Sequence, residues 1–546
     1  MKLKHNILYL SILLASCSEN SPDTNQNSQA IKGVKDESLL QELKNRDIGI
    51  NFKHDSGFSD EYSIYEPLGS GLAVIDYDND GDMDVFFAQY GRNSNESKLY
   101  SNNGFKFVDV TQNTGLSGIT DLVFASVADF NNDGWQDLLV GGEDILQLWE
   151  NDKGQGFKLS NIIKSPAGKQ FFTGATWFDY NKDGYLDVWV INYVDDRNEQ
   201  KCFLKNGLPA YCAPKAYKYL SNILYINHDG QYFQGNTNIP AQVEIAPALG
   251  VVADDFDNNG WTDIYIANDG VPNHLFMNLN GVINNDEAMK RGAAVNLMGE
   301  SEASMGVAKG DINNDSFPDL YITHLMGETN TFYINTNGYF VDRTAFSKLV
   351  QHVRQQTGFG TLFIDINADN LLDIVTVNGS IHNTEDSIDE KNRLAGESIQ
   401  LWFQKSAFQF EYQKNLIDSI AKKVGRGLVS ADMDNDGDVD ILINNNNGEP
   451  TTLINNSNPD SWIGIELNCH NRFDYGAELV YNKNNNEFMY KSIHSDGSYA
   501  SSIDPRVQFY IPKDNDIIEI HWLSGQKQSI SVSELNINQY NSIHCD

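Results

Sequence analysis

The sequence predicts an all-β protein in which a seven-bladed β-propeller is followed by a small β-sandwich-like domain. Three observations support this fold class. An aspartate-rich loop recurs seven times, and strand-like segments surround every copy. The repeat ends near residue 458, and the chain continues with alternating strands that lack the loop. Supersecondary units repeated along a chain are typical of propellers, whose blades each contain four strands. The seven loops begin at Asp76, Asp129, Asp179, Asp255, Asp311, Asp365 and Asp432.

Each loop has Asp at position 1, Asp or Asn at positions 3 and 5, and Asp at position 9. Calcium takes about six to eight oxygen ligands, and a tight loop can point alternate side chains toward one ion. Position 6 is glycine, which permits the turn, except for Ser316 and Asn370; Ser316 is the poorer fit. We therefore predict up to seven calcium sites. The expected side-chain ligands are Asp76, Asp78, Asp80, Asp84, Asp129, Asn131, Asp133, Asp137, Asp179, Asn181, Asp183, Asp187, Asp255, Asp257, Asn259, Asp263, Asp311, Asn313, Asp315, Asp319, Asp365, Asn367, Asp369, Asp373, Asp432, Asp434, Asp436 and Asp440.

Two alternatives to this metal-loop interpretation are an EF-hand and a set of metal-free turns. An EF-hand requires a glutamate at position 12 and a helix after the loop. Position 12 is instead a strand-type residue in every copy, such as Phe87 and Val140. Solvated Asp/Asn turns without metal would suffice for one copy, but seven copies in register favour calcium.

The segments around each loop predict the strands of one blade. In the first copy, "GLAVIDY" (71–77) and "MDVFFAQY" (83–90) flank the loop, and "KLYSNN" (98–103) and "FKFVDVT" (105–111) follow. The third-strand signal returns as "LWEN", "LYIN", "LFMN", "FYIN", "LWFQ" and "LINN". The last copy lacks a fourth strand, whereas "GINFKHDS" has no local partner. We therefore predict that residues 48–56 close the last blade and that the propeller spans residues 48–458.

Beyond the propeller, residues 459–546 contain short alternating strands such as "WIGIELN" and "IIEIHWL", which predict a small all-β domain. Within the propeller, three inserts lengthen the repeat at residues 194–222, 279–298 and 380–398. Long loops on a rigid scaffold are where function tends to lie.

The N-terminus predicts a lipoprotein signal peptide over residues 1–17. Two lysines precede a short apolar run, which ends in a Leu-Ala-Ser-Cys sequence like a bacterial lipobox. Cys17 would then be the lipidated first residue, and the polar residues 18–47 would form a flexible tether. An ordinary signal peptide cut nearby is the alternative. We expect an exported protein, lipid-anchored to the bacterial cell envelope, with the outer membrane as its destination.

Four further cysteines, an even number in an exported chain, predict two disulfides. Cys202 and Cys212 lie close together in one insert, and Cys469 and Cys545 bracket the C-terminal domain. Pairing within each couple is expected, although two other pairings are formally possible. The formal net charge of −36 excludes nucleic acid as a partner, and bound calcium would neutralise part of it.

These segments together resemble a known family. The chain is similar to bacterial relatives of cartilage acidic protein 1, in which FG-GAP/VCBS-type repeats precede an ASPIC/UnbV domain. The resemblance rests on "GSGLAVIDYDNDGDMDVFFA" (69–88), "GRGLVSADMDNDGDVDILINN" (425–445), "SIDPRVQFYIP" (502–512) and the cysteine-bearing insert. "QFYIP" stands where the family tends to read His-Phe-Gly-Leu. The repeat also resembles integrin α-chain propellers, which implies calcium on the blade loops.

The function expected first is that of a calcium-binding surface module. Its loop face and inserts would contact a glycan, a protein or another cell-envelope ligand. A purely structural spacer is a further possibility. The alternative from a different class is an enzyme with acid–base chemistry over the central channel, which is less favoured because no nucleophile, zinc or nucleotide motif occurs. Its candidate residues are Asp269, His274, Glu300, Glu302, Glu328, His324 and His382, and their meeting in one pocket would support catalysis.

Overall fold

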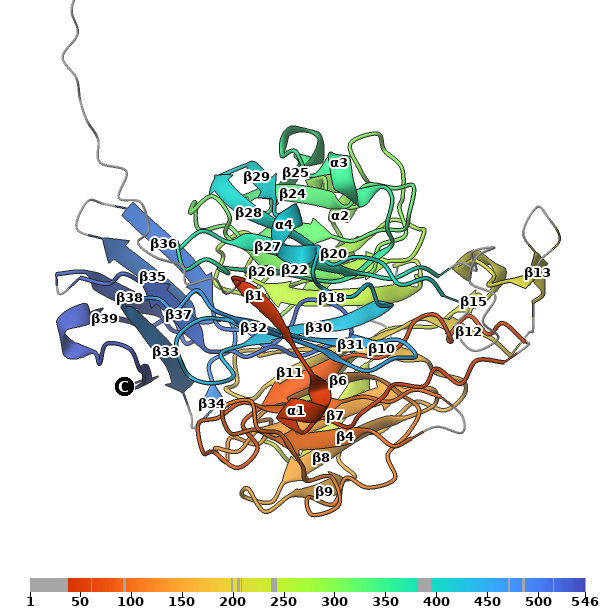
Figure 1. Cartoon of the computed structure of the whole chain (residues 1–546), viewed down its shortest axis with the longest axis horizontal. Coiled ribbons are helices and arrows are strands. Elements are labelled where there is room, and N and C mark those ends of the chain that lie inside the picture. Colours follow the sequence, from red (N-terminus) through yellow and green to blue (C-terminus); the bar gives the residue numbers. More distant parts are fainter. Residues whose placement is uncertain are drawn as a thin grey trace, which may run out of the picture. The chain divides into compact units, whose positions relative to one another are not determined.

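The computed structural model (Figure 1) describes most of the chain after residue 37. The described residues are 38–59, 61–91, 95–197, 200–203, 207, 209–236, 243–381, 394–469, 472–483, 487–513 and 515–545. The expected signal peptide, Cys17 and the first part of the tether lie outside these ranges.

The described residues before 457 form seven four-stranded antiparallel sheets, each repeating one strand order. Each aspartate-rich loop joins the first strand of a sheet to the second. The first strands are β2 (Leu72–Ile75), β6 (Leu122–Ala128), β10 (Phe172–Phe178), β18 (Ala248–Asp254), β22 (Val307–Gly310), β26 (Gly358–Ile364) and β30 (Gly425–Ala431). The second strands are β3 (Asp84–Phe87), β7 (Asp137–Gly142), β11 (Asp187–Asn192), β19 (Asp263–Asn268), β23 (Asp319–Ile322), β27 (Asp373–Asn378) and β31 (Asp440–Asn445).

The outer strands complete each sheet. The third strands are β4 (Lys98–Ser101), β8 (Leu146–Asn151), β16 (Ile223–His228), β20 (His274–Asn278), β24 (Thr331–Thr336), β28 (Gln400–Ser406) and β32 (Thr451–Asn455). The fourth strands are β5 (Val108–Asp109), β9 (Phe157–Ser160), β17 (Tyr232–Asn236), β21 (Ile283–Asp286), β25 (Tyr339–Asp342), β29 (Gln409–Tyr412) and β1 (Leu40–Leu43). The prediction of an all-β, propeller-like fold is therefore confirmed.

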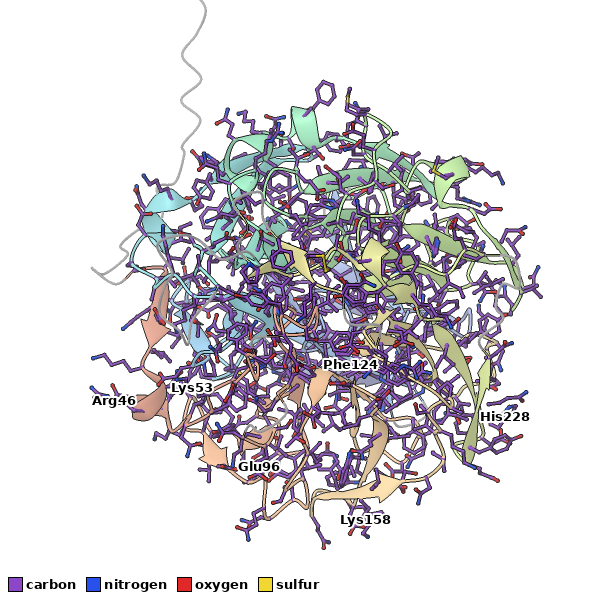
Figure 2. The ribbon with its side chains drawn as sticks, turned by 90° about the vertical axis from the view of Figure 1, so that its right-hand side faces the viewer. Arg46, Lys53, Glu96, Phe124, Lys158 and His228 are labelled. Atoms are coloured by element: carbon purple, nitrogen blue, oxygen red, sulfur yellow. A yellow bond between two sulfur atoms is a disulfide. The ribbon has the colours of Figure 1, made fainter. Side chains whose placement is uncertain are left out.

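Burial falls from the first strand to the fourth, which explains the sequence pattern of each repeat. Strands β2 and β3 are buried throughout, whereas β5 is exposed or half-buried. The first strands contact one another in the cyclic order β2, β6, β10, β18, β22, β26, β30 and again β2. In Figure 2 the sheets lie around a common centre near Phe124 of β6, with Lys158 and His228 at the periphery. Neighbouring sheets therefore bury both faces of the inner strands, which read as continuous apolar runs.

The strand that closes the last sheet lies earlier than predicted. Strand β1 pairs antiparallel with β32, with Leu40 opposite Asn455, whereas residues 49–56 form no strand. Ile50, Phe52 and His54 are buried alternately with exposed neighbours. That alternation comes from an extended segment packed across the sheets, because Phe52 stacks on Phe87 at 5.0 Å. Alternation indicates half-burial, which does not require ladder pairing. Residues 40–43 and 45–48, most of which were expected to belong to the tether at 18–47, instead form β1 and α1.

Short elements occupy the connections. The helices are α1 (Asn45–Ile48), α2 (Ala288–Arg291), α3 (Val350–Val353) and α4 (Lys414–Ile417), and the 3₁₀ turns are Pro214–Ala216, Thr344–Phe346 and Val532–Glu534. The first insert carries the small pairs β12 (Val194–Asp195) with β15 (Lys218–Tyr219) and β13 (Cys202–Phe203) with β14 (Pro209–Ala210). None of the helices in the described part of the chain has the length and apolar character needed to cross a bilayer.

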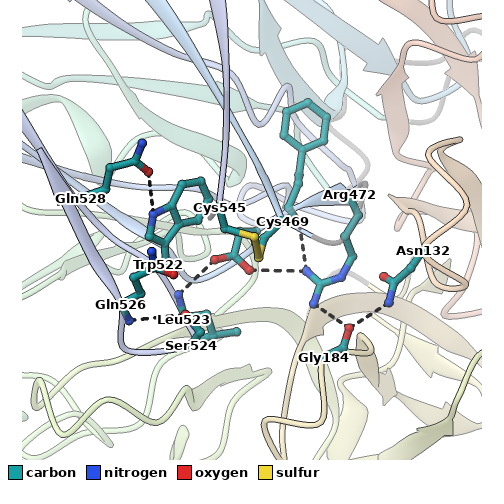
Figure 3. The surroundings of a disulfide bond; sticks show 12 residues. Asn132, Gly184, Cys469, Arg472, Trp522, Leu523, Ser524, Gln526, Gln528 and Cys545 are labelled. Atoms are coloured by element: carbon teal, nitrogen blue, oxygen red, sulfur yellow. Dashed lines mark hydrogen bonds and ion pairs between the residues drawn. A yellow bond between two sulfur atoms is a disulfide. The ribbon is translucent and has the colours of Figure 1, made fainter. Parts of the chain in front are cut away.

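The C-terminal domain has two four-stranded sheets. One contains β33 (Trp462–Cys469), β34 (Arg472–Phe473), β37 (Val507–Tyr510) and β40 (Tyr540–His544), and the other contains β35 (Glu478–Lys483), β36 (Glu487–Ser492), β38 (Ile517–His521) and β39 (Lys527–Ser531). The Cys469–Cys545 disulfide joins β33 to the residue that follows β40, as Figure 3 shows. Cys202 and Cys212 form the second disulfide, so both expected pairings are confirmed.

A segment of the C-terminal domain enters the ring of first strands. Residues 495–504, here called the plug, connect β36 to β37 and are buried throughout. Ser502 bridges Ala73 of β2, and Ser498 bridges Val307 of β22. The amide of Ala125 in β6 donates to the carbonyl of Ala500 at 3.4 Å. The plug therefore contacts strands from well-separated sheets and fills the centre between them.

Candidate functional site

The aspartate-rich loops share one backbone geometry. In the first loop, Asp76 accepts the amides of Asp80 and Gly81 at 3.1 Å each, and Asp80 accepts the amide of Asp82 at 3.0 Å. Asn79 and Gly81 have φ of 54° and 89°, the left-handed region that Asn and Gly adopt most readily. These bonds hold the backbone in a tight turn whose acidic side chains converge.

The position-6 substitutes keep this turn. Ser316 and Asn370 have φ of 72° and 66°, so both adopt the left-handed conformation expected of a glycine. Each still donates its amide to the first aspartate of its loop, Asp311 or Asp365, at 2.6 Å. The serine therefore strains the fifth loop without changing its shape.

The ninth aspartate is fixed by two backbone amides. Asp84 accepts the amide of Tyr77 at 3.1 Å on one oxygen and that of Asn102 at 2.9 Å on the other. The first donor is position 2 of the same loop, and the second ends the third strand. The same pair of bonds holds Asp137, Asp187, Asp263, Asp319, Asp373 and Asp440.

Three loops gather three carboxylates with ligand atoms within 4.8 Å of one another. These groups are Asp76, Asp78 and Asp84; Asp255, Asp257 and Asp263; and Asp432, Asp434 and Asp440. The other four loops have asparagine at position 3, so an amide oxygen takes the place of the third carboxylate. The structure thus brings the predicted ligands at positions 1, 3 and 9 together in three loops, whereas the position-5 side chains are not part of these groups.

The third position of these clusters leaves an oxygen without a partner. One carboxylate oxygen each of Asp78, Asp257 and Asp434 is buried and makes no hydrogen bond among the described residues. Burying a charged oxygen without a partner is costly, and a cation would supply the missing interaction. The residues present therefore fit a hard divalent ion with oxygen ligands.

Electrostatics within the loops point the same way. Burial, together with neighbouring carboxylates, raises the pKa of Asp84 to about 9 and that of Asp76 to about 6. Burial likewise raises the pKa of Asp263 and Asp440 well above the usual range. A bound cation favours the ionised forms and would remove this penalty.

A ring of amide side chains connects neighbouring loops, and it was not anticipated. Asn102 ends a third strand, and its side chain donates at 2.7 Å to the carbonyl of Met433, position 2 of the preceding loop. The equivalent bonds link Asn151 to Tyr77, Asn227 to Phe130, Asn278 to Tyr180, Asn335 to Phe256, Gln404 to Ile312 and Asn455 to Ile366. Each donor is an Asn or Gln at or next to the end of a predicted third-strand segment, so the signal was already present in "LWEN" and its equivalents.

The C-terminal domain covers part of the loop face. Tyr540 donates its hydroxyl to Asp432 at 2.9 Å, and Arg506 donates to the carbonyl of Asp432 at 3.2 Å. Arg472 donates to the carbonyl of Gly184 at 3.2 Å (Figure 3). These contacts reach loops of different sheets, so this part of the face is an internal interface.

The candidate catalytic residues converge only in part. The His324 imidazole lies 3.7 Å from Glu302, and both bond to the hydroxyl of Thr331 at 3.1 Å. Burial lowers the pKa of His324 to about 3, so the ring is neutral. His274 is buried within β20, and Glu300 is exposed on a loop. His382 lies outside the described residues.

The other two candidates, Asp269 and Glu328, line a cavity of about 300 Å³ where the second strands end. This cavity is here called the mouth pocket. Tyr193 donates its hydroxyl to Asp269 at 2.6 Å, and Glu328 accepts the amides of Ala303 and Leu325 at 3.0 and 3.3 Å. His324 and Glu302 do not line the pocket. The structure therefore brings two carboxylates together without a histidine partner.

Two family models match parts of this chain. A model described as FG-GAP-like repeat matches residues 76–140, 129–190 and 255–322, and one described as ASPIC and UnbV matches residues 468–544. The chain thus contains FG-GAP-like repeats and a C-terminal ASPIC/UnbV domain, as the sequence resemblance implied.

The chain is also similar to two vertebrate proteins along most of its length. It is 21% identical over 514 residues to cartilage acidic protein 1 of Xenopus tropicalis, covering 92% of this chain and 68% of that protein. It is 20% identical over 515 residues to cartilage acidic protein 1 of Mus musculus, covering 90% of this chain and 67% of that protein.

Solved structures resemble the chain only distantly. An Agrocybe aegerita lectin that recognises terminal N-acetylglucosamine has a TM-score of 0.38 and 14% identity, covering 72% of this chain and 93% of the lectin. Saccharomyces cerevisiae Sqt1 has a TM-score of 0.41 and 8% identity, covering 69% of this chain and 82% of Sqt1. Neither likeness bears on function.

Proposed function

We propose that this protein is a calcium-stabilised interaction module. The observation that carries the proposal is the unpartnered position-3 oxygen of Asp78, Asp257 and Asp434, each buried beside two further carboxylates. FG-GAP-like repeats suggest an interaction module, and their loops often bind calcium. Bound calcium would hold each loop through its position-1, position-3, position-5 and position-9 side chains.

Calcium titration of the EDTA-treated protein by isothermal calorimetry tests the metal sites. We expect binding in the range of about 10⁻⁴ to 10⁻³ M, because exported calcium modules are weak binders. Asp434→Asn should weaken one site, since it removes a carboxylate with one buried oxygen that lacks a hydrogen-bond partner among the described residues. Asp229→Asn is the matched control, because Asp229 is exposed in a turn at φ 53° that asparagine adopts equally well. Equal titrations of both variants and the parent would refute the assignment.

The interaction surface proposed is the face that carries the inserts and the mouth pocket. The C-terminal domain occupies part of the opposite, metal-loop face through Tyr540, Arg506 and Arg472. Tyr211 and Tyr219 of the first insert line the mouth pocket. Binding is favoured over acid–base catalysis because His324, the candidate base, does not line the pocket and burial lowers its pKa to about 3, which makes it a weak proton acceptor.

Export and lipid anchoring at Cys17 form part of the same proposal. Two disulfides are consistent with an oxidising compartment. Metabolic labelling with an alkyne palmitate tests the anchor in a bacterial host with lipoprotein processing. The parent protein should be labelled and fractionate with membranes, whereas Cys17→Ser should be unlabelled. Equal labelling of both would contradict lipidation at this residue.

A further inference from the structure

The mouth pocket is closed at its inner end by the plug. Tyr499 of the plug is fully buried, packs edge-on against Phe359 at 5.0 Å and donates its hydroxyl to the carbonyl of Leu68 at 3.2 Å. Phe359 and Leu68 both line the mouth pocket. The C-terminal domain therefore lies beneath the inner end of the pocket, where Phe359 and Leu68 line it. The pocket opens on the side of the first insert.

The floor and walls of the pocket are largely apolar. Leu249, Met305 and Phe359 come from the first strands or the residues just before them, and Leu68 and Ile64 come from the segment before the first repeat. The disulfide-bonded insert contributes Tyr211 and Cys212 as a side wall. An apolar surface of this kind can accommodate the aliphatic chain of a ligand and shield it from water.

Two carboxylates converge on this apolar surface. Asp269 uses one oxygen for Tyr193, and Glu328 uses one oxygen for two backbone amides. The second oxygen of each makes no hydrogen bond within the described part of the chain. Burial raises the pKa of Asp269 to about 6, and burial together with the like charges of Glu302 and Asp269 raises that of Glu328. Both groups thus lack the counter-charge that would favour ionisation.

The charges around these two acids do not supply that counter-charge. Lys215 is the one cationic side chain among the described lining residues, and it is exposed at the rim. An anionic ligand would be repelled by the paired acids, and a neutral one would leave them uncompensated. A cationic nitrogen would satisfy both through charge-assisted hydrogen bonds.

We propose that the mouth pocket binds an ammonium group carried on an apolar stem, with the ammonium between Asp269 and Glu328 and the stem over Leu249, Met305 and Phe359. The inference rests on the proposed interaction function and deepens it, because it gives the ligand class for the insert-bearing face. A free alkylamine and a lysine side chain of a partner protein present the same chemistry. Calcium takes no part in this recognition.

Calorimetric titration of the calcium-loaded protein with n-hexylammonium tests the proposal. Hexylammonium should bind roughly ten-fold or more tightly than 1-hexanol, which has the same stem without the charge, because hydrogen bonds to charged groups are strong. Hexanoate should not bind. Asp269→Asn and Glu328→Gln should each weaken hexylammonium binding roughly ten-fold. Nα-acetyl-lysine methylamide distinguishes a lysine side chain from a free alkylamine as the ligand. An affinity comparable to that of hexylammonium indicates a lysine side chain, and a weaker affinity indicates a free amine.

Glu300→Gln provides the control, since Glu300 is a nearby exposed acid that does not line the pocket. Its affinity for hexylammonium should equal that of the parent. Equal binding of amine and alcohol by the parent protein would overturn the proposal without relying on any variant. If the protein binds calcium but not hexylammonium, only the proposed ammonium site is refuted. If it binds hexylammonium but not calcium, the proposed metal sites are refuted and the ammonium site is supported.

Discussion

At the residue scale, the ninth aspartate of each loop connects the acidic cluster to the fold. Asp84 accepts one amide from its own loop and another from Asn102 at the end of the third strand. Its two oxygens therefore fix the loop against the sheet while facing Asp76 and Asp78. A single side chain thus connects the ligand set to strand pairing, which explains why aspartate is present at this position in all seven copies.

Replacing this aspartate should affect both roles. Asp84→Asn retains one acceptor for two amide donors, so one buried amide loses its partner, at a cost of about 1–3 kcal/mol. The loss of unfolding free energy should be larger with calcium than with EDTA, because a ligand is removed as well. Urea unfolding in both buffers measures this difference, with Asp229→Asn as control. A loss of equal size in both buffers would argue against a metal role for Asp84.

A second residue-scale prediction concerns His54. It is fully buried, accepts the amide of Asn447 at 3.0 Å on Nδ1 and contacts the Ser70 hydroxyl at 2.9 Å through Nε2. Burial first and nearby Arg426 second lower its pKa to about 3. In the unfolded chain the pKa of His54 is near 6.5. Between about pH 3 and 6.5 the unfolded chain therefore binds a proton at His54 that the folded protein does not bind. Stability contributed by neutral His54 is present above about pH 6.5 and is lost as pH falls toward 3.

His54→Asn keeps an acceptor for Asn447 and removes the titrating ring. In EDTA, the parent should lose about 1.4 kcal/mol more per pH unit than the variant below pH 6. Urea unfolding at several pH values gives the two slopes. Parallel slopes would show that His54 does not couple folding to protonation.

At the element scale, the sheets are connected by strand closure and by side-chain amides. Strand β1 comes from the start of the described chain and completes the sheet of β32, so distant segments close the last sheet. Asn455 of β32 donates to the carbonyl of Ile366 in the neighbouring loop at 2.9 Å. Equivalent bonds recur at every sheet, so a disturbance of one loop reaches its neighbour through one buried amide.

Asn455→Ala tests this connection. It should reduce the unfolding free energy by about 1–3 kcal/mol, because the carbonyls of Ile366 and Val439 lose a buried donor. Asn456→Ala is the matched control. Among the described residues, the side-chain amide of Asn456 bonds only to the exposed carbonyl of Ser38, so the substitution should change stability by less than about 0.5 kcal/mol. Similar losses in both variants, measured by urea unfolding, would contradict a special role for the ring of amides.

The sequence was sufficient to predict the elements that repeat. The loops, three of the four strands per copy and both disulfides follow from local spacing, and the structure has them, together with acidic clusters in three of the loops. The closing strand was misplaced because residues 49–56 alternate in burial without pairing, whereas "LQEL" (40–43) is too short and polar to indicate a strand. The plug and the mouth pocket depend on contacts between segments hundreds of residues apart, which no local pattern encodes. Asp269 and Glu328 were candidates, but their separation from His324 required the fold.

At the scale of the whole molecule, the C-terminal domain is part of the ring. Lys309 of β22 is buried between Asp254 of β18 at 3.2 Å and Asp496 of the plug at 3.0 Å. Asp496 also accepts the Thr176 hydroxyl and the amide of Ala253. Burial alone would raise the pKa of Asp496, but Lys309 and His494 hold it well below the usual range. The plug is therefore held by an ionic network that no solvent screens.

Lys309→Met should weaken this attachment strongly. The variant leaves buried Asp254 without its lysine and Asp496 with His494 alone, which costs about 3–5 kcal/mol. Lys348→Met is the control. Lys348 is exposed, so its replacement should change the unfolding free energy very little. Hydrogen exchange should show faster exchange at residues 495–504 in the first variant only. Unchanged protection of the plug would mean that the ion pair does not hold it.

Anomalous diffraction tests calcium binding by the acidic loops most directly. Crystals grown with about 10 mM calcium, roughly ten-fold above the weak end of the range for extracellular modules, would be measured at a long wavelength where calcium scatters anomalously. We expect peaks within the clusters at Asp78, Asp257 and Asp434, each close to the unpartnered carboxylate oxygen. Well-ordered loops without anomalous peaks at these three positions would contradict calcium binding.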